Sequence, residues 1–132
     1  TRALIGPMVE RGKGSIVGVG SVAGMCGGAA GAAYTASKHA MTGLTKNTAF
    51  FYGPQGVRCN LVAPGGVETN IGEAGGAPTV GWAWERMQAG FGRAQRTATP
   101  QEISALVVWL CSDEAVNVNG AVIPTDGGWT AA

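Results

Sequence analysis

Residues 14–21 read Gly-Ser-Ile-Val-Gly-Val-Gly-Ser, and this stretch decides the fold class. Its β-branched residues favour an extended backbone, and the absence of charge is typical of a strand that is buried on both faces. Two further short runs of this kind occupy residues 57–62 and 121–125. Each run is followed by turn residues, so the sequence predicts three short strands.

Helical patterns separate these strands. The longest runs from 34 to 52, where we expect Ala40, Met41, Leu44 and Thr48 to share one face. Further helices are predicted over 2–11 and near 79–90, and a last one from Thr99 to about Ser112 begins with a capping box completed by Glu102. Alternation of strand and helix predicts an α/β fold, a parallel sheet covered on both faces, with right-handed crossovers.

The bulk composition excludes several classes of function. The chain has 132 residues, which suits one domain, and a net charge of +1 with scattered Lys and Arg, so nucleic acid and anionic membrane are not expected partners. No apolar run reaches the ~20 residues that span a bilayer, and no signal peptide is visible. The three cysteines, Cys26, Cys59 and Cys111, are spaced for neither a disulfide framework nor a metal site. We expect reduced, mostly buried thiols, a cytoplasmic protein and no bound metal.

Tyr34 and Lys38 are spaced i,i+4 near the start of the longest helix, which places both on one face. A nearby ammonium group favours the ionised form of a phenol, and a helix N-terminus adds positive potential in the same direction. Such a phenol can exchange a proton with an alcohol or a carbonyl oxygen. The spacing alone is weak evidence, because a partly buried Tyr followed by a solvated Lys is common in helices.

Ser21 strengthens the signal because it ends the first strand, thirteen residues before Tyr34. In a parallel sheet the carboxyl ends of strands and the N-termini of helices meet at one edge, where ligands bind. We therefore expect the Ser21 hydroxyl and Tyr34 to face the same substrate oxygen, with Lys38 also in reach of a cofactor ribose.

Together, these segments resemble the short-chain dehydrogenase/reductase family over essentially the whole chain. They occur in the family's order and spacing: Gly14-Ser15-Ile16-Val17, Ser21-Val22-Ala23-Gly24, Tyr34-Thr35-Ala36-Ser37-Lys38, Arg58-Cys59-Asn60, Pro64-Gly65-Gly66-Val67-Glu68-Thr69, Thr99-Pro100-Gln101-Glu102-Ile103, and Gly120 through Asp126-Gly127-Gly128. The chain departs from the family at Gly20, where another Ser is frequent. The resemblance implies a Rossmann-like, doubly wound parallel sheet, of which this chain is the carboxyl-terminal portion with about three strands.

The resemblance also implies roles for individual residues. Ser21, Tyr34 and Lys38 would be catalytic, with Tyr34 as general acid/base in the NAD- or NADP-dependent interconversion of an alcohol and a ketone or aldehyde. The residues implied to bind the cofactor are Tyr34, Lys38, Pro64, Gly65, Val67 and Thr69. Residues 70–98 would form a substrate lid, with Trp82, Trp84, Met87 and Phe91 as its apolar members.

The family's glycine-rich TGxxxGxG turn, which places a pyrophosphate at a helix N-terminus, is not found before Ser21. We therefore expect residues 1–132 to be the carboxyl-terminal catalytic part of one Rossmann-type domain, with an open edge on strand 15–20. That edge would pair with an amino-terminal half or with another chain, and the resemblance implies a homo-oligomer, a dimer or tetramer built on the family's assembly helices. The alternative is a non-catalytic remnant that acts as an interaction module.

Three other polar residues receive structural interpretations. His39 follows Lys38 and is expected at the surface. Asn60 is expected to support the end of a strand, and Asp126 to hold the carboxyl-terminal turn.

Overall fold

The computed structural model describes residues 1–71 and 80–131. Its elements are helix α1 (Arg2–Glu10), strand β1 (Gly14–Val19), the short 3₁₀ helix η1 (Val22–Gly24), helix α2 (Ala32–Tyr52), the 3₁₀ turn η2 (Gly53–Gln55), strand β2 (Val57–Pro64), helix α4 (Gly81–Phe91), helix α5 (Pro100–Cys111), the turn η3 (Asp113–Ala115), strand β3 (Val122–Thr125) and the turn η4 (Trp129–Ala131). The predicted order of strands and helices is confirmed, with element ends displaced by one or two residues.

The three strands form one parallel sheet in the order β1-β2-β3. Gly14 pairs with Val57 and Val19 with Val62, and further along β2 Pro64 pairs with Thr125. All three carboxyl ends therefore lie at the same edge of the sheet. Among the described residues β1 has β2 as its one neighbour, so the predicted open edge is present.

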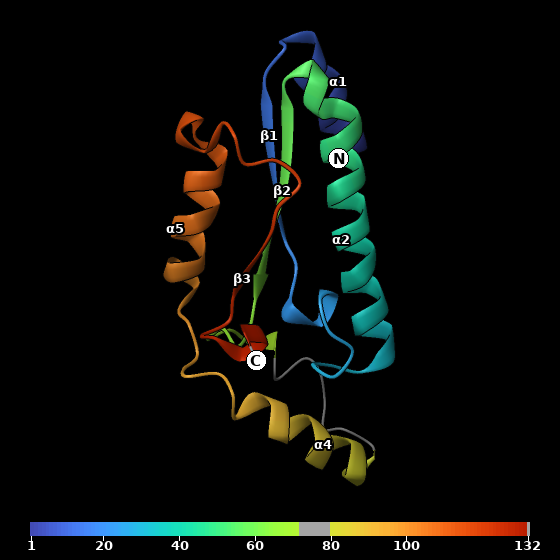
Figure 1. Cartoon of the computed structure of the whole chain (residues 1–132), viewed down its shortest axis with the longest axis vertical. Helices are drawn as coiled ribbons and strands as arrows, with labels where there is room; N and C mark the ends of the chain where they lie inside the picture. The colour runs from blue at the N-terminus through green and yellow to red at the C-terminus, as the bar shows by residue number, and fades with distance from the viewer. Residues whose placement is uncertain (72–79, 132) are drawn as a thin grey trace.

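Helices cover both faces of this sheet, as Figure 1 shows: α5 lies on one side and α1 and α2 lie on the other. The core beneath α5 is built from Val62, Ile103, Leu110 and Ala115, all buried. On the opposite face α2 packs on β2, whose Val57, Cys59 and Asn60–Pro64 are buried. This is the α/β arrangement that alternating strands and helices predict.

The start of α5 follows the predicted capping box. Thr99 is the N-cap, its Oγ1 accepts from the Glu102 backbone N–H at 3.4 Å, and the Glu102 carboxylate accepts from the Thr99 N–H at 2.7 Å. Pro100 occupies the first helical position, where no N–H is needed. Two otherwise unpaired helix N-terminal groups are thereby satisfied, and the helix begins at a defined residue.

The four residues expected to share one face of α2 differ in burial. Leu44 is 55% exposed, whereas the buried residues are Thr45, Thr48 and Ala49. Small side chains allow α2 to lie close to β2, so its larger apolar residues, including Phe50 and Phe51, point away from the sheet.

The prediction of mostly buried cysteines is wrong. Cys59 is buried, Cys26 is half-buried, and Cys111 is exposed because it ends α5 next to the solvent-facing turn η3. Burial raises the pKa of the Cys59 thiol, and hydrogen bonds from Thr45 and Thr48 oppose this effect in part.

Candidate active site

Ser21 lies just beyond β1, at the carboxyl edge of the sheet. Ser21 was expected from the sequence to end the strand, but the strand ends at Val19, two residues earlier. Ser21 is instead the N-cap of η1. Its Oγ accepts a hydrogen bond from the Ala23 N–H at 3.1 Å. Because this bond uses an oxygen lone pair, the hydroxyl proton of Ser21 can be donated to a ligand.

Tyr34 and Lys38 lie on the first two turns of α2. Gly31 is the N-cap, so Tyr34 is the third helical residue, and its side chain is 37% exposed. The Lys38 Nζ lies 5.3 Å from the centroid of the Tyr34 ring, a cation–π distance. Within the described part of the chain Lys38 forms no ion pair, so its charge is directed to Tyr34 and to the cleft beside it.

A cleft of about 320 Å³ brings the predicted site residues together. Its walls include Ser21, Tyr34, Lys38, Pro64, Gly65, Val67 and Thr69. They come from the ends of β1 and β2 and from the start of α2, three segments that meet because the sheet is parallel. Sequence reasoning missed Ile103, which lines the same cleft from the first turn of α5.

The floor of this cleft rests on the carboxyl-terminal turn. A Cβ atom added to Gly65 would stand 3.0 Å from both Cα and Cβ of Asp126, so a larger residue would have to push the two segments a few tenths of an ångström apart. Asp126 in turn accepts hydrogen bonds from the N–H groups of Gly128, at 3.0 Å, and Thr130, at 2.9 Å. Burial would raise the pKa of this carboxyl, but the bonds from Thr130 and Gly128 outweigh it and lower the pKa. Asp126 thus holds the turn, as expected from the sequence.

Asn60 also has the structural role that was expected. It is fully buried in β2, its Nδ2 donates to the Val118 carbonyl at 2.8 Å, and its Oδ1 accepts from the Ala121 N–H at 3.0 Å. These bonds hold residues 118–121, which precede β3, against β2. His39 is exposed, as predicted.

The two ends of the predicted lid, residues 70–98, are joined to each other. Val67 and Ala98 form an isolated parallel bridge, in which the Ala98 N–H donates to the Gly66 carbonyl and the Glu68 N–H donates to the Ala98 carbonyl, both at 2.9 Å. Residues 72–79 of this segment lie outside the described residues. The remainder contains α4, which projects below the sheet in Figure 1.

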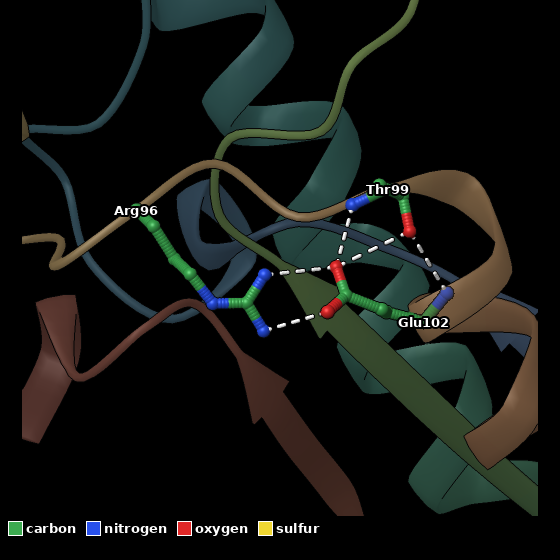
Figure 2. A network of polar contacts seen from close by, with 3 residues as sticks. All are labelled: Arg96, Thr99 and Glu102. Atoms are coloured by element: carbon green, nitrogen blue, oxygen red, sulfur yellow. Dashed lines mark hydrogen bonds and ion pairs between the residues drawn. The ribbon is translucent and has the colours of Figure 1, made fainter.

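Arg96 and Glu102 fasten the carboxyl end of that segment to α5 (Figure 2). The Arg96 guanidinium donates to both carboxylate oxygens of Glu102, at 2.7 and 2.9 Å. Glu102 also accepts from the backbone N–H of Thr99. The bond from Arg96, reinforced by the bonds from Thr99, lowers the pKa of Glu102 to about 2, and the same pair raises the pKa of Arg96.

A second cleft, of about 410 Å³, opens on the other side of Ser21 and Tyr34. Phe91 and Trp129 form its apolar wall, with their ring centroids 5.1 Å apart, and Trp84 lies 5.9 Å from Phe91. Trp129 is buried in η4 and was not identified from the sequence. Ser21 and Tyr34 therefore line both clefts.

The described residues contain neither a metal-binding cluster nor a membrane-spanning helix. No group of three or more His, Cys, Asp or Glu side chains in them is placed to hold a metal ion. None of their helices combines the length and the apolar character required to cross a membrane.

Comparison with known proteins places this geometry in a family. A family model described as enoyl-(acyl carrier protein) reductase matches residues 1–130. The chain is 45% identical to 3beta-hydroxysteroid dehydrogenase 2 of Eggerthella lenta, over 99% of this chain and 50% of that protein. The chain belongs to the short-chain dehydrogenase/reductase family. A 3-alpha-(or 20-beta)-hydroxysteroid dehydrogenase of Mycobacterium bovis is 44% identical, with 98% of this chain and 46% of that protein covered.

Solved structures of the same family share the fold. An oxidoreductase of the short-chain dehydrogenase/reductase family from Burkholderia thailandensis superposes with a TM-score of 0.79 at 34% identity, covering 98% of this chain and 49% of that one. A 4-hydroxyisoleucine dehydrogenase complexed with NADH gives a TM-score of 0.78 at 33% identity, with 99% and 53% covered. The Rossmann-type assignment is thereby confirmed, and this short-chain dehydrogenase/reductase chain spans about half the length of the curated relatives it matches.

Proposed function

We propose that this chain supplies the proton-transfer and substrate-binding side of an NAD(P)-dependent oxidoreductase that interconverts an alcohol and a ketone. The observation that carries the proposal is the single cleft that Ser21, Tyr34 and Lys38 share with the turn from Pro64 to Thr69. In the proposed reaction Tyr34 exchanges a proton with the substrate oxygen, while Ser21 donates a hydrogen bond to that oxygen. Lys38 provides positive charge beside the phenol.

The residues of this cleft fit the nicotinamide end of such a cofactor. Lys38 and the hydroxyl groups of Tyr34 and Thr69 supply donors for a polar ligand, while Val67 and Pro64 supply apolar walls. Lys38 would hold a ribose hydroxyl, and Val67 and Thr69 the carboxamide. When bound, this group donates or accepts a hydride. The 4-hydroxyisoleucine dehydrogenase similar to this chain is complexed with NADH.

A hydroxysteroid or a related apolar alcohol is the substrate class we propose. Two relatives at 44–45% identity are named as hydroxysteroid dehydrogenases. The cleft beside Tyr34 supports this choice, because Phe91 and Trp129 present an aromatic wall of the kind that a rigid apolar molecule requires. The segment 70–98, held at its base by the Val67–Ala98 bridge, would act as the lid.

The test uses a chimera in which residues 1–132 follow the amino-terminal half of the Eggerthella lenta relative. We expect NADH- or NADPH-dependent reduction of a 3-ketosteroid, and we expect Tyr34→Phe to lower kcat about 10²- to 10⁴-fold, the usual effect of general acid–base catalysis. Tyr52→Phe is the matched control, since Tyr52 lies at the far end of α2. A folded Tyr34→Phe protein with unchanged kcat would refute the proposed role.

A non-catalytic interaction module is the second candidate, and exposed apolar side chains on α2 favour it. Phe50 is 76% exposed and Phe51 59%, with their rings 5.2 Å apart. Titration of the whole chain with NADH or NADPH separates the two candidates. Saturable binding that is lost in Lys38→Ala supports the oxidoreductase, whereas a folded chain that binds neither cofactor supports the module.

A further inference from the structure

A third cleft, of about 620 Å³, extends the site away from the reacting residues. It lies between α4 and the loop of residues 26–31 that follows η1. Trp129 lines both this outer cleft and the one that contains Ser21 and Tyr34, so the two adjoin. A substrate whose reacting oxygen lies at Tyr34 can therefore place its far end in the outer cleft.

The wall of the outer cleft combines large apolar side chains with positive charge. Trp82, Met87 and Trp129 supply large apolar side chains, and Arg86 and Arg93 supply two guanidinium groups. Among the described residues that line this cleft, none is acidic. The cleft therefore presents an apolar surface and two cationic groups to a bound molecule.

Arg86 and Arg93 differ from the arginine of the neighbouring cleft. Arg96 also borders the site, but its charge is paired with both oxygens of Glu102. Across residues 1–71 and 80–131, Arg86 and Arg93 form no ion pair within 4 Å. Their guanidinium donors are available for a carboxylate, which they can bind in a bidentate manner.

We infer that the substrate carries a carboxylate at the end of its apolar body opposite the reacting alcohol or ketone, and that Arg86 and Arg93 bind this group. The inference rests on the proposed function and adds the substrate's charge to it. The alternative is that the cleft binds neutral substrates and that Arg86 and Arg93 simply face solvent.

The experiment compares two substrates of the chimera that differ only in charge. A 3-ketosteroid with a side-chain carboxylate is measured beside its methyl ester, and we expect a KM about tenfold lower for the acid with similar kcat, as one well-placed charge-assisted pair provides. Because both arginines are exposed, this advantage should shrink as the salt concentration rises.

Variants identify the residues responsible. The double change Arg86→Gln with Arg93→Gln should raise the KM of the acid about tenfold and leave the ester unaffected, while Lys at both positions should restore part of the difference. Arg2→Gln is the control, since Arg2 is exposed on α1 and lines none of the three clefts. Tryptophan fluorescence provides a readout without turnover, because Trp82 and Trp129 line the outer cleft.

The outcomes separate the inference from the proposed function. Equal KM values for acid and ester, or a double variant that still prefers the acid, overturn the inference while the oxidoreductase assignment stands. A folded chimera that reduces neither compound overturns the proposed function and this inference with it. A preference for the acid that disappears in the double glutamine variant supports both.

Discussion

The backbone of Gly24 lies directly against the backbone of Lys38. A Cβ atom added to Gly24 would stand 2.6 Å from the Lys38 carbonyl oxygen, a separation that real Cβ atoms do not reach. The Thr42 Oγ1 fixes the same contact from α2 by donating to the Gly24 carbonyl at 3.1 Å. Since Gly24 ends the 3₁₀ turn that Ser21 caps, this approach sets how far Ser21 lies from Tyr34 and Lys38.

Gly24→Ala should therefore damage both stability and activity. The added methyl group has to push η1 away from α2, at a cost of about 1–3 kcal/mol in the free energy of unfolding. The kcat of the chimera should fall by more than the loss of folded protein explains, because the separation of Ser21 and Tyr34 changes. Urea denaturation and steady-state kinetics measure the two effects.

Gly43→Ala is the matched control for this prediction. Gly43 lies on the same helix, is exposed, and a Cβ atom there would meet nothing within 4 Å. Alanine at this position should leave kcat unchanged and stabilise the helix by about 0.5–1 kcal/mol. Equal stability losses in the two variants would show that the Gly24–Lys38 approach is not a constraint.

Asn60→Ala should destabilise the sheet without touching the cleft. The change removes a fully buried amide, leaves the Ala121 N–H without its partner, and leaves the Val118 carbonyl with the bond from Arg58 Nη1 alone, so it should cost about 2–4 kcal/mol. Asn117→Ala, at an exposed position, should change the unfolding free energy by less than about 0.5 kcal/mol. A loss below 1 kcal/mol for Asn60→Ala would contradict the role assigned to it.

Sequence patterns predicted the elements and the meeting of the site residues, because both follow from local rules. Short β-branched runs define strands, and a parallel sheet brings their carboxyl ends together wherever the chain goes between them. Ser21, Tyr34 and Lys38 could thus be placed at one edge of the sheet, whereas the turn at Gly65 was assigned to the same site through the family resemblance; all four line one cleft.

Long-range packing could not be predicted in the same way. The buried residues of α2 are Thr45, Thr48 and Ala49, and of these the face expected from the sequence included Thr48 alone. Trp129 belongs to the site because the carboxyl-terminal turn returns beneath Gly65. No local pattern reports that return, and none reports that Arg96 pairs with Glu102.

Glu102 should make the stability of the protein depend on pH in the acidic range. Its pKa in the folded protein is about 2, below the ordinary value of 4.5, so the unfolded chain binds its proton first as the pH falls. The stabilisation is fully present above pH 4.5 and is lost between pH 4.5 and about 2. Thermal unfolding of wild type and Glu102→Gln should therefore differ at pH 7 and converge toward pH 2.

Glu10→Gln is the control for this pH dependence, since Glu10 is exposed on α1 and belongs to neither of the ion pairs found in the described residues. Its melting temperature should follow that of the wild type at every pH. A constant difference between wild type and Glu102→Gln down to pH 2.5 would mean that the bonds to Arg96 and Thr99 do not stabilise the fold.

The open edge of β1 predicts that the 132-residue chain associates in solution. Along residues 14–19 the strand pairs with β2 on one side, and on the other side its N–H and C=O groups have no strand partner among the described residues. Such an edge binds another strand readily, from a second copy or from an amino-terminal half supplied separately. Intact mass with light scattering should therefore show a dimer or a larger species.

Val19→Lys tests whether this edge is responsible, because a charge on an edge strand opposes strand addition. Val19 is 50% exposed at the end of β1, and Val116, 72% exposed after η3, offers the same change away from the sheet edge. Val19→Lys should shift the chain toward monomer, and Val116→Lys should not. A folded monomer of 13.3 kDa for the unaltered chain would contradict the prediction, since it would mean that the β1 edge is stable without a partner.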